Sequence, residues 1–157
     1  MSDLTELITG LPCFKAPSNI TPLGGGITNT NVTVEDEDCK YVVRIGSDIA
    51  EHGVMRWNEL ALSQAAYQLG ISPKVIYHKT GVLVLEFIDA HTLDEAAVRE
   101  PKNLIRIINL VAKTHRGIGK CLHSPILTFW PFQINQTYMS RLAVSYTHLR
   151  AHETPVN

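Results

Sequence analysis

The sequence lacks the features that mark several large classes of protein. Its three cysteines, Cys13, Cys39 and Cys121, are odd in number and far apart, so we expect free thiols rather than a disulfide framework. Nothing near Met1 resembles a signal peptide, and no apolar run approaches the length of a membrane span. The net charge is -1 and there is no basic stripe, which argues against nucleic-acid partners. These absences predict a cytoplasmic protein that binds neither membranes nor nucleic acids.

Several motifs of catalysis and metal binding are missing as well. The sequence has no Gly-x-Ser-x-Gly nucleophile elbow and no Walker phosphate loop. Its seven histidines do not have the spacing of metal ligands. The composition, with 45% hydrophobic and 18% charged residues, is that of a chain that folds around a core. We therefore expect a folded chain without a metal site or a hydrolase nucleophile of its own.

The most informative segment is a glycine turn between two stretches of strand-like sequence. Gly24, Gly25 and Gly26 follow one stretch, and a Thr-rich alternating stretch returns from Thr28 to Val34. Glycines let the backbone turn tightly and approach a polyphosphate, because no Cβ stands in the way. This is the arrangement of the glycine loop that covers ATP phosphates in protein kinases. Taken alone, the same glycines are also compatible with a simple flexible turn.

A cation and a carboxylate follow the glycine turn in a suggestive order. Arg44 lies in the apolar strand predicted at 41–45, where a charge requires a partner or an anionic ligand. The spacing of apolar residues predicts a helix over 50–69, and Glu59 falls at the edge of its apolar face. The pair matches the cation and helix glutamate that hold phosphates in kinases. An ordinary salt bridge is the structural alternative.

The remaining pattern predicts an α+β fold. Two further strands are expected at 74–78 and 82–88, separated by a turn at Gly81. Together with the three earlier strands they predict a twisted antiparallel sheet of about five strands that packs against the 50–69 helix. In a kinase-like lobe, the end of the 82–88 strand would be the hinge whose backbone binds adenine.

The ordered set of motifs resembles the choline/ethanolamine kinase branch of the aminoglycoside phosphotransferase superfamily, over residues 20–115. The motifs are Gly-Gly-x-Thr-Asn-x-Asn, Val-Val-Arg-Ile, Asn-Glu-Leu, Gly-Ile-x-Pro-Lys-Val and Leu-Glu-Phe-Ile. The resemblance implies a protein-kinase-like N-lobe. It also implies that Arg44 holds the ATP phosphates, that Glu59 orients Arg44, and that Glu86 and Ile88 offer hinge backbone groups. The implied phosphate loop consists of Gly24, Gly25, Gly26, Thr28 and Asn29.

The resemblance also implies a function for the parent protein. It would transfer the γ-phosphate of ATP, with Mg²⁺, to a hydroxyl of a small amino alcohol such as choline or ethanolamine. Thiamine and aminoglycoside kinases are alternatives within the superfamily, and a noncatalytic nucleotide-binding or interaction fragment is the alternative outside catalysis. The catalytic loop His-x-Asp-x-x-x-x-Asn and the metal-binding Asp beyond it do not occur in this chain. We therefore assign no catalytic residue and no metal ligand here, and expect residues 1–157 alone to be inactive.

The expected domain organisation follows from these assignments. Residues 1–90 form the nucleotide-binding N-terminal lobe, and 91–143 begin a truncated C-terminal lobe. That second part opens with a capping box, Thr92-Leu93-Asp94-Glu95, that begins a short helix, and it continues with a helix over 101–118, whose apolar face includes His115 as a core residue. We expect this helix to leave apolar surface unburied. Residues 144–157 resemble one reading frame of a sequencing adapter, so we exclude them from functional reasoning as one would an expression tag.

Overall fold

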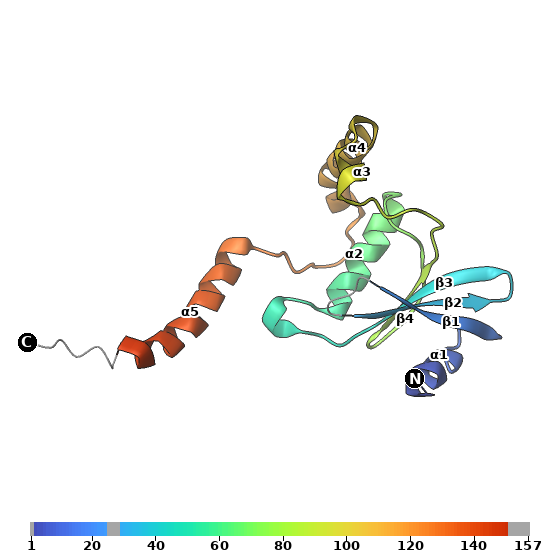
Figure 1. Cartoon of the computed structure of the whole chain (residues 1–157), viewed down its shortest axis with the longest axis horizontal. Coiled ribbons are helices and arrows are strands. Elements are labelled where there is room, and N and C mark those ends of the chain that lie inside the picture. Colours follow the sequence, from blue (N-terminus) through green and yellow to red (C-terminus); the bar gives the residue numbers. More distant parts are fainter. Residues whose placement is uncertain (1, 25–28, 151–157) are drawn as a thin grey trace, which may run out of the picture. The chain divides into compact units, whose positions relative to one another are not determined.

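The computed structural model describes residues 2–24 and 29–150, and the chain divides into two compact units, Met1–Ile126 and Leu127–Asn157. The first unit contains a five-stranded sheet and most of the helices (Figure 1). The second contains the helix α5 (Pro131–Arg150), which includes part of the adapter-like segment. The strands of the first unit are β1 (Pro17–Leu23), β2 (Thr30–Asp36), β3 (Cys39–Ile45), β4 (Val75–Lys79) and β5 (Val82–Glu86).

The sheet is antiparallel throughout, with the strand order β1-β2-β3-β5-β4. β2 and β3 form a tight hairpin in which Asp36 pairs with Cys39, and Glu37 at the turn has a left-handed φ of 54°. The sheet and its helices confirm the predicted α+β class and are consistent with a kinase-like N-lobe. The start of β2 lies beside the end of β3, because Thr30 pairs with Ile45. The end of β3 in turn lies beside the start of β5, because Ile45 also pairs with Val82.

One face of the sheet forms the core with an N-terminal helix that we did not predict. Alternate residues of β2, β3 and β5, including Val34, Val43 and Val84, point to this face and are fully buried. The helix α1 (Ser2–Thr9) covers it and contributes Ile8, and Leu11 follows the helix into the same cluster (Figure 1). Residues of opposite parity in β3, such as Arg44, therefore face away from this core.

The predicted 50–69 helix begins later than expected. Residues Ala50–His52 form a separate 3-10 turn, which ends at Gly53 with a left-handed φ of 66°. A bridge between Ile49 and Val54 closes this turn, and α2 (Arg56–Gln68) starts after it. The spacing of apolar residues did not reveal this break. Apolar residues continue at helical intervals on both sides of Gly53, whereas the helical backbone is interrupted there. The strands predicted at 74–78 and 82–88 correspond to β4 and β5, and their observed ends lie within two residues of the predicted ones.

Three further elements complete the first unit. They are α3 (Glu95–Arg99), α4 (Pro101–Gly117) and the 3-10 turn η2 (Ile118–Cys121). The cap differs from the predicted capping box, because the N-cap of α3 is Asp94 rather than Thr92, and Asp94 Oδ1 accepts a hydrogen bond of 2.7 Å from the Ala97 N–H. The C-terminal end of α4 lies against the end of α2, where a Cβ on Gly117 would come within 2.5 Å of Leu69 Cδ1. Gly117 therefore allows the two helices to approach closely.

The apolar face of α4 is largely exposed, as the sequence predicted. Ile105 and Ile108 are 61% and 56% exposed, and Leu104 and Val111 are exposed too. The prediction for His115 was wrong, because it is exposed rather than part of a core. Its side of the helix is turned away from α2, and no segment among residues 2–24 and 29–150 buries it.

This exposed face leads to a prediction about solution behaviour. The double variant Ile105→Glu/Ile108→Glu should self-associate less than the wild-type chain at the same concentration, because it removes two exposed apolar side chains. Light scattering during concentration measures this. A matched Asn109→Glu variant on the same helix should behave as wild type. Equal scattering by all three proteins would show that the α4 face does not drive association.

The described residues contain neither a membrane-spanning helix nor a group of potential metal ligands. None of the described helices combines the length and hydrophobicity needed to cross a membrane. Within the same residues, no three His, Cys, Asp or Glu side chains lie together as metal ligands would. All three cysteines are free thiols, as predicted.

Candidate functional site

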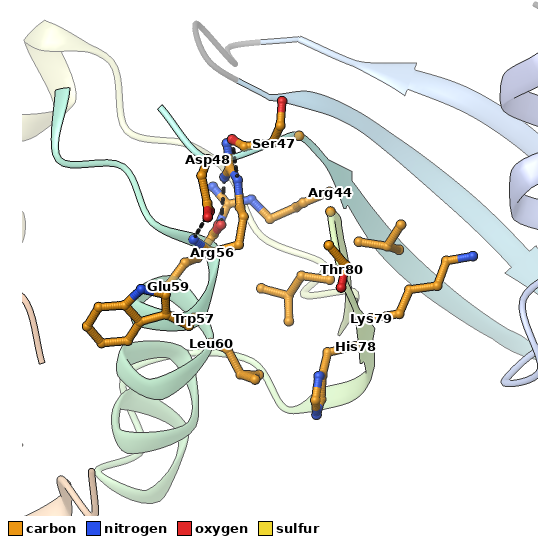
Figure 2. Close-up of a pocket in the computed structure, with 14 residues that line it drawn as sticks. Arg44, Ser47, Asp48, Arg56, Trp57, Glu59, Leu60, His78, Lys79 and Thr80 are labelled. Carbon is orange, nitrogen blue, oxygen red and sulfur yellow. Dashed lines mark hydrogen bonds and ion pairs between the residues drawn. The ribbon is translucent and has the colours of Figure 1, made fainter. Parts of the chain in front are cut away.

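The structure brings together the cation and the carboxylate that the sequence predicted as a pair. Arg44 extends from β3 and its Nη1 lies 2.9 Å from Glu59 Oε1 on α2 (Figure 2). The two side chains are 36% and 20% exposed, so the pair is partly shielded from water. Arg44 lies on the face opposite the core, because Tyr41, Val43 and Ile45 of β3 face the core cluster. The alternation of the strand thus places the cation where the helix glutamate can reach it.

A second guanidinium, not predicted from the sequence, shares the same carboxylate. Arg56 Nη1 donates to Glu59 Oε2 at 2.7 Å. Its Nε donates to the Ser47 carbonyl oxygen at 2.9 Å, and its backbone N–H donates to Asp48 Oδ1 at 2.6 Å (Figure 2). Glu59 therefore bridges two arginines, one through each oxygen. The spacing of Arg56 and Glu59 by three residues in a helix was the available signal.

Three buried polar atoms near this cluster have no hydrogen-bond partner among the residues that the structure describes. They are Arg56 Nη2, Asn29 Oδ1 and Asn31 Oδ1. Asn31 pairs with Arg44 across β2 and β3. Asn29 follows the glycine turn, and a Cβ on Gly46 would lie 2.8 Å from both Asn29 Oδ1 and Arg56 Nη2. Gly46 therefore leaves the space in which the end of the glycine turn meets the start of α2.

A cavity of about 800 Å³ opens beside this cluster. It lies between the end of β3, the first turns of α2 and the turn from β4 to β5 (Figure 2). Arg44, Arg56 and Lys79 line it together with the acidic Asp48 and Glu59, so cations outnumber carboxylates. Trp57 and Leu60 of α2 and Leu83 of β5 add apolar wall. An excess of positive charge beside apolar surface suits an anionic ligand that also carries an apolar group.

The other predicted site residues lie apart from the cavity lining. Gly24 is exposed at the end of β1, while Gly25, Gly26 and Thr28 lie outside the described residues. Asn29 is half-buried and reaches the cluster through its approach to Gly46.

The predicted hinge residues lie at the far end of β5. The strand runs from Val82, at the cavity, to Glu86, a distance of about 13 Å at the usual rise of a strand. Ile88 follows the strand and is 54% exposed. The Glu86 N–H donates to the Lys74 carbonyl oxygen at 2.9 Å. The backbone group of Glu86 that could contact a ligand is therefore its own carbonyl oxygen. The predicted phosphate residue Arg44 lies beside the start of β5, because it pairs with Leu83, and the predicted hinge residues lie at the other end of that strand.

Titrating groups with shifted pKa values gather around the β2–β3 hairpin. Burial raises the pKa of the Cys13 thiol above its usual 9.0, with a smaller contribution from the charge of Asp36. A hydrogen bond with Cys39 raises the pKa of Tyr41 above 10.0, and burial adds to the shift. The folded state therefore favours the neutral thiol and the neutral phenol. Their contribution to stability is present below the ordinary pKa values and is lost as the pH rises through the raised pKa values.

Comparison with known proteins gives one informative similarity. No protein-family model and no curated protein sequence matches the chain. Among solved structures, the chain is similar to an ethanolamine kinase from Plasmodium vivax, with a TM-score of 0.54 and 25% sequence identity. The match covers 63% of this chain and 26% of that one, so the matched part spans about a quarter of the length of the kinase. The similarity supports a kinase-like fold for this chain.

Proposed function

We propose that this chain is the nucleotide-binding part of an ATP-dependent kinase for a small molecule. The observation that carries the proposal is the ion pair of 2.9 Å between Arg44 and Glu59, in a sheet that is similar to that of a kinase. The carboxylate fixes the guanidinium at the end of the sheet next to the glycine turn. A cation held there neutralises phosphate charge without further reorganisation. Residues 1–90 form the nucleotide-binding lobe in this proposal, 91–143 begin the second lobe, and the adapter-like 144–157 take no part.

Each predicted residue then has a physical role. The backbone of Gly24, Gly25 and Gly26 folds over the phosphates, with Thr28 and Asn29 supplying polar side chains at the end of the turn. Arg44 binds phosphate oxygens, and Glu59 orients it. The carbonyl oxygen of Glu86 and the N–H of Ile88 bind the adenine edge.

The described carboxylates beside Arg44 do not form the magnesium site that a kinase uses with ATP. Mg²⁺ prefers carboxylate oxygens and water. The two carboxylates at the cluster, Asp48 and Glu59, already accept hydrogen bonds from Arg56, and Glu59 also pairs with Arg44. This donor set does not fit a magnesium ion. We therefore place the metal ligands and the catalytic base of the reaction outside residues 1–157.

The proposed acceptor is a small amino alcohol, choline or ethanolamine. The similarity to an ethanolamine kinase supports this class, and the sequence motifs support it independently. Thiamine and aminoglycoside kinases are the competing acceptor classes, and a noncatalytic nucleotide-binding fragment is the competing role. A longer protein that contains this chain distinguishes them, because phosphorylation of choline or ethanolamine but not of an aminoglycoside supports the first class.

Nucleotide binding tests the proposal on the chain itself. Arg44→Ala should weaken ATP binding about tenfold, since a charge-assisted hydrogen bond to phosphate contributes about 1.5–3 kcal/mol. Calorimetric titration of ATP into the 157-residue chain measures this. Arg99→Ala is the matched control, because Arg99 pairs only with Glu95 on the exposed surface of α3. If Arg44→Ala and Arg99→Ala bind ATP equally well, the phosphate site is elsewhere.

A further inference from the structure

Arg56 is held so that one of its nitrogen atoms remains without a protein partner. Its Nε and Nη1 donate to the Ser47 carbonyl oxygen and to Glu59 Oε2. Its side chain is only 16% exposed, so the guanidinium has little freedom to reorient. Nη2 is buried and makes no hydrogen bond to any of residues 2–24 and 29–150. A buried donor without an acceptor is unfavourable, so native structures usually satisfy it.

The free nitrogen points toward the end of the glycine turn. Arg56 Nη2 and Asn29 Oδ1 would each lie 2.8 Å from a Cβ on Gly46, so the two atoms lie within twice that distance of each other. Both are buried, and neither has a hydrogen-bond partner within the described part of the chain. An amide can turn its NH₂ group to where its oxygen lies, because the two ends have the same shape. Arg56 and Asn29 together can therefore offer two donors to one anionic oxygen.

The cluster also leaves the Arg56 guanidinium incompletely paired. Arg44 and Arg56 carry two positive charges and share one carboxylate, Glu59. Asp48 balances the formal charge of the group, but it accepts from the backbone N–H of Arg56 rather than from its guanidinium. Nη2 of Arg56 therefore stays available to an acceptor at the point where β2, β3 and α2 meet.

We propose that Arg56 is a second phosphate-binding residue, whose Nη2 donates to a phosphate oxygen of the nucleotide beside Asn29. The inference rests on the proposed nucleotide-binding function and adds a residue to that site. Glu59 then positions two arginines rather than one. Gly46 is essential to this contact, because a side chain there would fill the space between Arg56 and Asn29.

The experiment compares ATP with adenosine, which lacks phosphates, by calorimetric titration of the full 157-residue chain. Arg56→Lys keeps a positive charge that can pair with Glu59 but removes the second nitrogen. It should weaken ATP binding about tenfold and leave adenosine binding unchanged. A purely structural role of Arg56 would weaken both ligands. Arg99→Lys is the matched control and should bind both as wild type does.

Gly46→Ala provides the second variant, and it changes neither arginine. Its methyl group should weaken ATP binding, as Arg56→Lys does, and leave adenosine binding unchanged. If Arg56→Lys does not fold, Gly46→Ala alone tests whether Arg56 binds phosphate. Wild-type ATP affinity in Arg56→Lys and Gly46→Ala, with weakened binding in Arg44→Ala, would overturn this inference and leave the proposed function intact. Failure of the wild-type chain to bind ATP at millimolar concentration would overturn both.

Discussion

Replacing Val84 with aspartate is expected to abolish the cooperative unfolding transition of the chain. Val84 is fully buried in β5, between β3 and β4, and belongs to the cluster that joins the sheet to α1. An unpaired carboxylate there costs several kcal/mol, in addition to the lost apolar contacts. Domains of this size are stable by only about 5–15 kcal/mol, so the change removes most or all of the stability.

Thermal unfolding followed by circular dichroism measures this effect. The matched control is Val98→Asp on α3, because Val98 is 40% exposed and loses little burial. This control should unfold within a few degrees of wild type. A Val84→Asp protein with the same unfolding transition as Val98→Asp would show that β5 is not at the centre of the core.

Asp36→Ala is expected to destabilise the fold by about 1–3 kcal/mol, because it leaves two partly buried backbone donors without their acceptor. The Asp36 side chain is buried and accepts from the backbone N–H groups of Lys15 and Ala16. The bond from Ala16 is 2.6 Å long. These bonds fasten the segment between α1 and β1 to the β2–β3 hairpin.

Chemical denaturation of three variants tests the role of Asp36. Asp36→Asn keeps one acceptor oxygen and should lose less stability than Asp36→Ala. Asp38→Ala changes an exposed carboxylate in the adjacent turn and should stay within about 0.5 kcal/mol of wild type. Similar midpoints for Asp36→Ala and Asp38→Ala would mean that the segment before β1 does not depend on these hydrogen bonds.

The features predicted correctly from the sequence are those that depend on local patterns. The alternation in β2, the apolar runs in β3 and β5 and the turn at Gly81 indicate the sheet, so its class and strands were predictable. The pairing of Arg44 with Glu59 was predictable as well. A cation within an apolar strand requires a carboxylate partner, and the helix that follows the strand provides one. The helix α1 could also have been predicted, since Leu4, Leu7, Ile8 and Leu11 have helical spacing.

Other features depend on contacts that no local pattern contains. The break before α2 arises from the left-handed backbone of Gly53, which periodicity does not detect. The placement of Arg56 depends on Gly46 and Asn29, which belong to other elements. The exposure of His115 depends on which segments pack against α4, and a helical pattern identifies an apolar face without identifying what covers it.

Mapping the ATP contacts on the chain by nuclear magnetic resonance tests the central claim most directly. In a titration of the isotope-labelled 157-residue chain, the account predicts the largest amide shift changes at residues 24–31, 44–46 and 86–88. These segments hold the glycine turn, the Arg44 cation and the proposed hinge. Changes confined to the exposed face of α4 would contradict the claim that this sheet is a kinase-like nucleotide-binding lobe.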